Sequence, residues 1–157
     1  RSYLNRTRVG SGMRYRQGVI IILKKGELFL LARKKGSEEW YFPAGGQEQK
    51  ESVTETFYRE IAEELGLQKE CVSSVRISSV THRYEWGEAF RQKTGYDGQE
   101  QHIVIAELLG DINLSGQNEL EEVRFVKGSD LLRTIAHKDL QETVRKMIAQ
   151  GELDGVK

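Results

Sequence analysis

The amino-acid sequence predicts an α+β fold, in which helices pack against a mixed β-sheet. The apolar and largely β-branched run Gly18–Leu23 is typical of a strand buried on both faces. Val53–Leu65 carries the start and stop signals of a helix, so the expected order is strands, helix, strands and a second helix. The length of 157 residues suits one domain with a substantial core better than two.

The remaining elements follow from shorter patterns. Leu28–Ala32 is predicted to pair with Gly18–Leu23 as a hairpin, because Lys24–Glu27 between them is a turn sequence. Trp40–Gly46 holds the chain's single proline and a Gly-Gly pair, so it is expected to be a loop. Further expected elements are strands at Ser73–Tyr84, His102–Leu108 and Val123–Val126, a polar loop at Trp86–Gln101, and a helix at Asp139–Ala149 capped by Asp139 and Glu142.

The first twelve residues differ from the rest of the chain. They end in Gly10-Ser11-Gly12 directly before Met13, which indicates the remnant of an expression tag; a native flexible arm is the alternative. Residues 13–157 are then the single domain.

The composition excludes several classes of function. Lys and Arg together number 24, and so do Asp and Glu, which argues against a general binder of DNA or other polyanions. The single cysteine, Cys71, excludes an intramolecular disulfide and a cysteine-cluster zinc site. The longest apolar run, Val19–Leu23, is too short to span a membrane, and no signal peptide precedes it. A soluble, cytoplasmic protein without a membrane partner is expected.

Charge is unevenly distributed along the chain. Residues 1–40 carry ten basic and three acidic side chains, whereas residues 41–72 carry three basic and seven acidic ones. Adjoining regions of opposite charge suit a site that holds a phosphate and its bridging metal ion. Charges scattered over a solvated surface are the alternative.

The helix at Val53–Leu65 carries the most informative pattern. Ser52 and Glu55 form a capping box at its start, and Gly66 stands where a left-handed C-terminal cap is expected. Glu60, Glu63 and Glu64 share one sector of the helical wheel, away from the apolar face. Because like charges at this spacing repel, a hard divalent cation, Mg²⁺ or Mn²⁺ in its place, would stabilise them. An acidic, solvated helix face is the alternative.

This segment resembles the signature of the Nudix hydrolases. All nine defined positions match, in the order Gly45-x5-Glu51-x7-Arg59-Glu60-Ile61-x-Glu63-Glu64-x-Gly66-Leu67. The resemblance implies an α/β/α sandwich that hydrolyses a nucleoside diphosphate linked to another group, with two or more Mg²⁺ ions. The resemblance also implies that Glu60, Glu63 and Glu64 are catalytic and bind the metal ions, and that Gly45 lies at the metal site. Arg59 would orient a carboxylate, and Glu51 would tie the loop to Arg59. Gly45 and Gly66 would allow backbone turns.

Residues outside the signature resemble the bacterial RNA 5′-pyrophosphohydrolases and the related dinucleoside polyphosphate hydrolases. The matching segments are Tyr15-Arg16, Ala32-Arg33, Trp40–Gly46, Gly98–Gln101 and Glu119–Glu121. Trp40–Gly46 departs from the W-Q-F-P-Q-G-G of that group, because Tyr41 and Ala44 replace both glutamines.

These matches imply further site residues. Arg16, Arg33, Gln99 and Gln101 would contact substrate, and Glu119 would be an additional catalytic and metal-binding carboxylate. Each has an alternative, since both arginines can be ordinary surface residues and Glu119 can belong to a charged turn.

The remaining candidates are histidines and aromatic residues. His82 and His102 lack a metal-ligand partner at the usual spacing, so they are expected to be structural or to contact a base. Tyr84, Trp86 and Phe90 could stack a base or simply form a hinge.

Three functions remain open. The first removes pyrophosphate from 5′-triphosphorylated RNA, with free nucleoside triphosphates as possible further substrates. The second hydrolyses free nucleotides alone, such as dinucleoside polyphosphates, nucleoside triphosphates or nucleotide sugars. The third is a silent nucleotide-binding module, which the complete set of signature glutamates disfavours. Arg16 and the basic edge favour RNA, whereas the neutral net charge and the two missing glutamines favour free nucleotides. Either a monomer or a homodimer fits.

Overall fold

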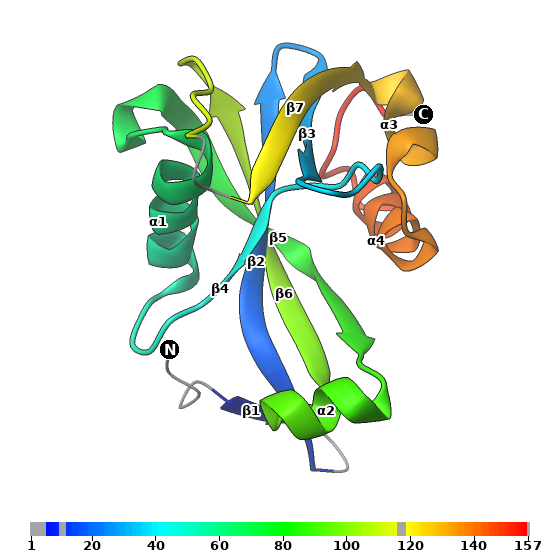
Figure 1. Cartoon of the computed structure of the whole chain (residues 1–157). Coiled ribbons are helices and arrows are strands. Elements are labelled where there is room, and N and C mark those ends of the chain that lie inside the picture. The colour runs from blue at the N-terminus through cyan, green and yellow to red at the C-terminus, as the bar shows by residue number, and fades with distance from the viewer. Residues whose placement is uncertain (1–5, 10–11, 116–118, 157) are drawn as a thin grey trace.

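The structure, a computed structural model, describes residues 6–9, 12–115 and 119–156 (Figure 1). The order of strands and helices along the chain is β1 Arg6–Val9, β2 Met13–Lys25, β3 Leu28–Lys34, β4 Ala44–Gly46, α1 Val53–Leu65, β5 Val72–Glu85, α2 Glu88–Thr94, β6 Gly98–Leu108, β7 Leu120–Lys127, α3 Gly128–Thr134 and α4 Lys138–Ala149. A short 3₁₀ turn, Lys69–Cys71, precedes β5.

The strands form one mixed sheet. Its main order is β5-β6-β2-β3-β7, with β1 and β4 also paired to β2. The β2–β6 pair is parallel, whereas β2 is antiparallel to β3 and β4. The expected α+β class with a mixed sheet is confirmed.

The sheet opens between β2 and β3. These two strands pair only near their turn, at Lys24–Phe29 and Lys25–Leu28. Further along, β4 takes the place beside β2, and Tyr41 pairs with Ala32 of β3 instead. The opening brings the segment before α1 into the middle of the sheet, where the candidate site lies.

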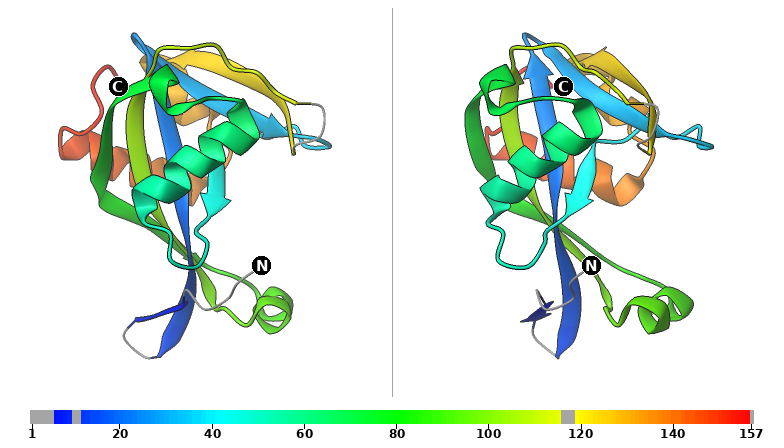
Figure 2. Two further views of the ribbon diagram at one scale, coloured as in Figure 1. Left: turned by 90° about the vertical axis from the view of Figure 1, so that its left-hand side faces the viewer. Right: turned by 60° about the vertical axis from the view of Figure 1, so that its left-hand side comes forward.

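Two apolar cores cover the two faces of the sheet. Odd-numbered residues of β2, such as Val19 and Ile21, pack with Phe57 and Ile61 of α1. Even-numbered residues, such as Ile20, pack on the other face in a core that includes residues of α3 and α4. Figure 2 shows α1 on one side of the twisted sheet and α3 and α4 on the other, which is the expected α/β/α sandwich.

Helix α1 has the predicted limits and caps. Ser52 and Glu55 form both bonds of the capping box, and Gly66 adopts a left-handed conformation with φ of 67°. The second helix was predicted with the wrong cap: α4 begins at Lys138, His137 is the N-cap without a side-chain bond, and Asp139 accepts a bond from the backbone N–H of Leu140.

Several expected boundaries were also wrong. Trp40–Gly46 is not wholly a loop, because its last three residues pair with β2 as β4. The expected polar loop at Trp86–Gln101 contains α2 and the start of β6. Helix α3 was not predicted, and the long strands extend beyond their expected ends. Backbone pairing extends a strand past the apolar residues that signal it in the sequence.

The ends of β2, β5 and β6 project beyond the sandwich together with β1 and α2 (Figure 2). Strand β1 lies in the segment expected to be a tag remnant, and it pairs with residues 13–16 of β2. Of that segment, residues 1–5 and 10–11 lie outside the described part, and its origin stays a prediction. No described helix is long and apolar enough to cross a membrane.

Candidate active site

A cavity of about 770 Å³ lies where the sheet opens. It is lined by the acidic face of α1, residues between Lys34 and Glu48, residues of β2, β5 and β6, Glu119, and the start of α4. The predicted site residues that line it are Arg16, Gly45, Arg59, Glu60, Glu63, Glu64, Gln99, Gln101 and Glu119.

Arg59 organises the acidic end of this cavity. Its Nε lies 2.6 Å from Glu51 Oε2, and its Nη1 lies 2.9 Å from Glu60 and 3.2 Å from Glu63. Its Nη2 donates to the carbonyl oxygen of Gly46 at 2.8 Å. The arginine therefore joins α1 to β4.

Glu51 is the strongest partner of this arginine. Its Oε1 also accepts bonds from Arg59 Nη2 at 2.9 Å and from the Thr56 hydroxyl at 3.0 Å. The hydrogen bond with Arg59 lowers the pKa of Glu51 to about 2, although partial burial opposes this change. Glu51 is thus ionised at neutral pH and fixes the loop before α1.

Glu60 is the buried member of the acidic group, with 8% of its surface exposed. Burial raises its pKa to about 7, and the nearby charge of Arg59 limits the rise. Its carboxyl group lies directly over Gly45: a Cβ atom at that position would stand 2.1 Å from the Glu60 Cδ. A larger residue at position 45 would therefore displace the Glu60 carboxyl group.

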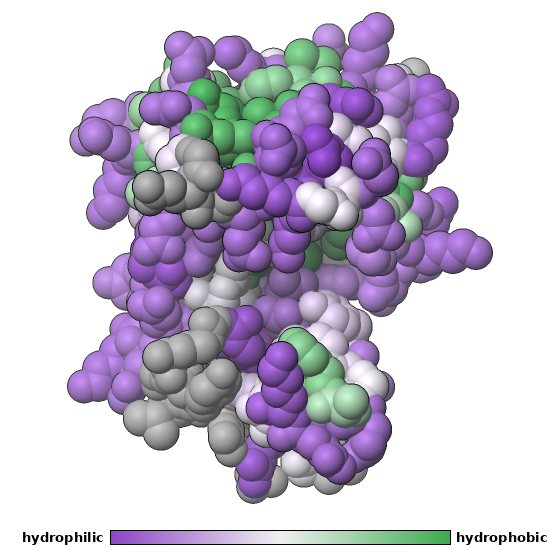
Figure 3. Space-filling view, viewed as in Figure 1, coloured by the Kyte–Doolittle hydropathy of each residue, from purple (hydrophilic) through white to green (hydrophobic). Residues whose placement is uncertain are grey.

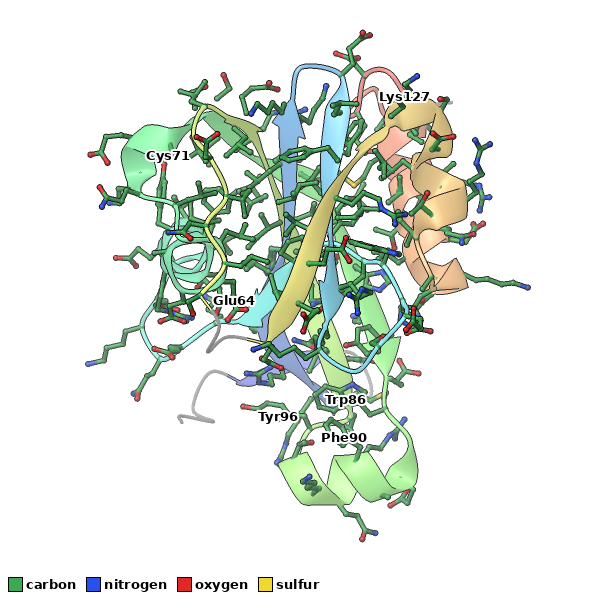
Figure 4. The ribbon with its side chains drawn as sticks, turned by 45° about the horizontal axis from the view of Figure 1, so that its top comes forward. Glu64, Cys71, Trp86, Phe90, Tyr96 and Lys127 are labelled. Atoms are coloured by element: carbon green, nitrogen blue, oxygen red, sulfur yellow. The ribbon has the colours of Figure 1, made fainter. Side chains whose placement is uncertain are left out.

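Glu64 of α1 and Glu119, which directly precedes β7, are close enough for their charges to interact. Figure 4 shows Glu64 on the side of α1 that faces the sheet. Burial first, and then the charges of Glu119 and Glu63, raise the pKa of Glu64, while Lys34 opposes the rise. The pKa of the Tyr41 hydroxyl is raised by burial and by Glu119 and Glu64. Mutual repulsion of this kind disfavours the ionised state unless a cation is present.

These residues suit a hard divalent cation in their chemistry. Every side-chain donor is a carboxylate oxygen, which Mg²⁺ and Mn²⁺ prefer, and the buried Glu60 faces a polar cavity. Among the described residues, no three acidic, histidine or cysteine side chains already stand in metal-binding geometry. In particular, Glu60 and Glu63 both point to Arg59.

The opposite end of the cavity carries amides and rings. Gln101 and Gln99 are 7% and 8% exposed, and the Tyr84 hydroxyl donates to Gln99 Oε1 at 2.8 Å. His82 is buried, with Nδ1 2.7 Å from the Thr143 hydroxyl, and burial lowers its pKa. Neutral hydrogen-bonding groups beside aromatic rings suit a nucleoside better than a phosphate.

Arg33 is not among the residues that line the cavity. Its guanidinium donates to the carbonyl oxygen of Ser37 at 2.9 Å and to Glu122 at 3.1 Å. The neighbouring Lys34 lines the cavity in its place. His102 also has a local partner, since its Nε2 lies 3.3 Å from Gln17 Oε1.

Sequence reasoning missed several lining residues, among them Lys34, Tyr41, His137 and Asp139. Tyr41 was signalled only as a departure from the W-Q-F-P-Q-G-G pattern. His137 and Asp139 reach the cavity because α4 begins there, which no local pattern reveals. These residues line the cavity because of where the fold places them, and their residue types alone do not indicate this.

Comparisons with known proteins agree with this geometry. Residues 13–150 match the family model of the NUDIX domain. An RNA pyrophosphohydrolase of Shewanella frigidimarina is 34% identical over 90% of this chain and 88% of its own length. Another of Haemophilus influenzae is 34% identical over 64% of this chain and 52% of its own length.

Solved structures show the same fold. Escherichia coli dihydroneopterin triphosphate pyrophosphohydrolase has a TM-score of 0.69 at 12% identity, over 87% of this chain and 98% of its own. A Caenorhabditis elegans Ap4A hydrolase in a binary complex has a TM-score of 0.63 at 19% identity, over 86% of this chain and 96% of its own. With the signature complete and its Arg59, Glu60, Glu63 and Glu64 lining one cavity, this chain belongs to the NUDIX domain family.

Proposed function

We propose that this protein hydrolyses a phosphoanhydride bond of a nucleoside polyphosphate and that its main substrate is 5′-triphosphorylated RNA, from which it removes pyrophosphate. The proposal depends above all on one cavity that combines an acidic end with an end lined by amide and aromatic side chains. Similarity to RNA pyrophosphohydrolases over most of the chain supports the choice of RNA.

Metal ions belong to this proposal. Glu60, Glu63, Glu64 and Glu119, with the backbone of Gly45, would hold two or more Mg²⁺ ions, and Mn²⁺ would substitute. When bound, such ions neutralise the polyphosphate and lower the pKa of a coordinated water.

The protein's own residues would then position the reactants. Arg59 sets the direction of Glu60 and Glu63, while Glu51 and the Gly46 carbonyl fix Arg59 itself. A carboxylate oxygen of the acidic group takes the proton of the attacking water. Gln99, Gln101 and Tyr84 would bind the nucleoside, and Arg16 a phosphate.

Hydrolysis of free nucleotides alone is the second candidate. Tyr41 and Ala44, which replace the two glutamines of the RNA-hydrolase pattern, and the net charge of zero favour it. For either substrate we propose a cytoplasmic monomer or homodimer that contacts neither DNA nor a membrane.

Product analysis separates these candidates. The protein would be assayed with Mg²⁺ on 5′-triphosphorylated RNA, diadenosine tetraphosphate, free triphosphates and ADP-ribose at equal concentration. We expect a monophosphorylated RNA end and the highest kcat/KM for RNA. A preference for a free nucleotide would support the second candidate, and no turnover of any substrate would support a binding module.

The variant that tests the acidic end as the reaction centre is Glu64→Gln, which keeps the size of the side chain and removes its charge. We expect a loss of about 1,000-fold in kcat, because the charge holds metal and substrate together. Circular dichroism and Tm would show that the variant is folded. Near-normal turnover would contradict the assignment of the acidic end as the reaction centre.

A further inference from the structure

A second cavity, of about 510 Å³, lies beside α2, and we call it the α2 groove. Among described residues, it is lined by Trp86, Phe90, Lys93 and Thr94 together with three residues that also line the active-site cavity, namely Arg16, Tyr84 and Gln99. The two cavities are therefore neighbours that share one wall.

The shared wall is a row across three adjacent strands. Gln99 of β6 is directly paired with Arg16 of β2 and with Tyr84 of β5, so the three side chains lie on the same face of the sheet. The Tyr84 hydroxyl bonds to Gln99, which fixes the row. A ligand that extends from the active-site cavity across this row enters the α2 groove.

Aromatic side chains follow one another from the active-site cavity to the α2 groove. The centroids of His82 and Tyr84 are 5.5 Å apart, those of Tyr84 and Trp86 6.4 Å, and those of Trp86 and Phe90 4.6 Å. The Tyr84–Trp86 and Trp86–Phe90 contacts are edge to face, with interplanar angles of 71° and 89°. Figure 4 shows Trp86 next to Phe90 of α2. Accessible aromatic rings are what proteins use to stack the bases of a single strand.

Core packing does not account for Trp86 and Phe90. Neither belongs to the two core clusters, and Phe90 is 45% exposed. A small apolar patch interrupts the hydrophilic surface at α2 (Figure 3). Trp86 is nevertheless held firmly, because its N–H donates to the Asp97 carbonyl and its own carbonyl accepts a 2.6 Å bond from Arg91 Nε.

The charge of the groove indicates an anionic ligand. Arg16 and Lys93 line it, whereas no Asp or Glu does so among described residues. The Lys93 ammonium lies 5.9 Å from the centre of the Phe90 ring. Cations beside exposed rings suit a nucleotide, with its phosphate near the cations and its base on the rings.

The position of the groove indicates which ligand it can hold: the second nucleotide of an RNA or the second nucleoside of a dinucleoside polyphosphate. Along β2, Gly18 pairs with Gly46 next to the acidic end, and Arg16 is two residues further toward α2. The groove thus lies beyond the nucleoside end of the active site. In RNA the second nucleotide is attached to the 3′ oxygen of the first nucleoside, so it would lie on the side of the active site where the α2 groove is. In a dinucleoside polyphosphate the second nucleoside is attached through the phosphates, on the acidic side.

We propose that the α2 groove binds the second nucleotide of an RNA substrate, with its base on Trp86 and Phe90 and its phosphate between Arg16 and Lys93. This inference rests on the proposed function and deepens it. The groove would be the feature that favours an RNA chain over a free triphosphate with the same first nucleoside.

The kinetic test uses chain length. The values of kcat/KM would be measured for a nucleoside triphosphate and for 5′-triphosphorylated RNAs of two and four nucleotides with the same first base. We expect a rise of about 10- to 100-fold from one nucleotide to two, the range that one stacked base supplies, and little further gain at four. Phe90→Ala and Trp86→Ala should each lower kcat/KM for RNA about tenfold more than for the free triphosphate.

Ile77→Ala is the matched control, because Ile77 is an exposed apolar residue of β5 that lines neither cavity. It should leave the gain from chain length unchanged. If kcat/KM rose equally with chain length in Phe90→Ala and in the unmodified protein, the proposal would be overturned. A larger effect of Phe90→Ala on diadenosine tetraphosphate than on RNA would do so as well.

Binding without turnover separates this proposal from the proposed function. A 5′-monophosphorylated RNA carrying 2-aminopurine at its second position would be titrated with the protein, and stacking would quench its fluorescence. We expect quenching with the unmodified protein and Ile77→Ala, and at least tenfold weaker binding with Phe90→Ala. Quenching without RNA hydrolysis would reject the proposed function and keep the groove. Absence of quenching would overturn the groove, whatever the activity.

Discussion

At the acidic end of the cavity, Arg59 and three glutamates hold one another in place by side-chain bonds, whereas the two rings of the α2 groove are held by the backbone bonds of Trp86 and by their contact with each other. Arg59 alone bonds to Glu51, Glu60, Glu63 and the Gly46 carbonyl. In the groove, Phe90 is 45% exposed, and the backbone of Trp86 supplies the bonds that hold the segment.

The difference follows from what each region has to do. The rate of a reaction falls when the catalytic groups move by about 1 Å, so the carboxylates need further hydrogen bonds that hold them in position. A stacking surface tolerates different bases and needs only an accessible ring. Substitutions should therefore cause large, sharp losses at the acidic end and smaller, substrate-dependent ones at the groove.

The largest contrast should come from two glycines. Gly45→Ala places a Cβ 2.1 Å from the Glu60 Cδ, whereas a Cβ at Gly87, which precedes α2, meets nothing within 4 Å. We expect Gly45→Ala to lower kcat/KM about 100-fold, because Glu60 must move. Gly87→Ala should change kcat/KM less than about threefold and stability by less than about 1 kcal/mol. Steady-state kinetics and Tm measure both, and similar losses in the two variants would contradict the contrast.

The next effect concerns stability and its dependence on pH. The pKa of Glu51 is lowered to about 2 from 4.5, so its bond with Arg59 stabilises the fold fully above pH 4.5 and loses this effect as the pH falls toward 2. Glu51→Gln should cost about 2 kcal/mol of unfolding free energy at pH 7 and much less at pH 3.

Urea unfolding at both pH values measures this difference. Glu70→Gln is the control, because Glu70 is an exposed glutamate beyond α1 and lies outside the bonds of Arg59. Its substitution should change stability by less than about 0.5 kcal/mol at either pH. An equal cost of Glu51→Gln at pH 7 and pH 3 would show that its charge is not what Arg59 requires.

The same contrast explains what could be predicted from the sequence. The helix at Val53–Leu65, its caps and its carboxylates were predictable because they depend on contacts within one short segment. The α2 groove was not, because Arg16, Gln99 and Tyr84 meet only through pairing of strands distant in sequence. Likewise β4 was expected to be a loop, since nothing local in Ala44-Gly45-Gly46 indicates a strand.

Arg33 and Lys34 provide the smallest and most specific test, because sequence resemblance favours the first and the structure favours the second. Arg33 is engaged by Glu122 and the Ser37 carbonyl, whereas Lys34 lines the cavity and its charge counters the raised pKa of Glu64. Lys34→Ala should lower kcat/KM about tenfold through loss of a phosphate contact. Arg33→Ala should lower it less than about threefold and cost at most about 1 kcal/mol of stability, as for an ion pair with an exposed partner. Kinetics of both variants on triphosphorylated RNA decide between them. A larger loss in Arg33→Ala would mean that the substrate draws this guanidinium away from Glu122, and the cavity would then extend past Lys34 when substrate is bound.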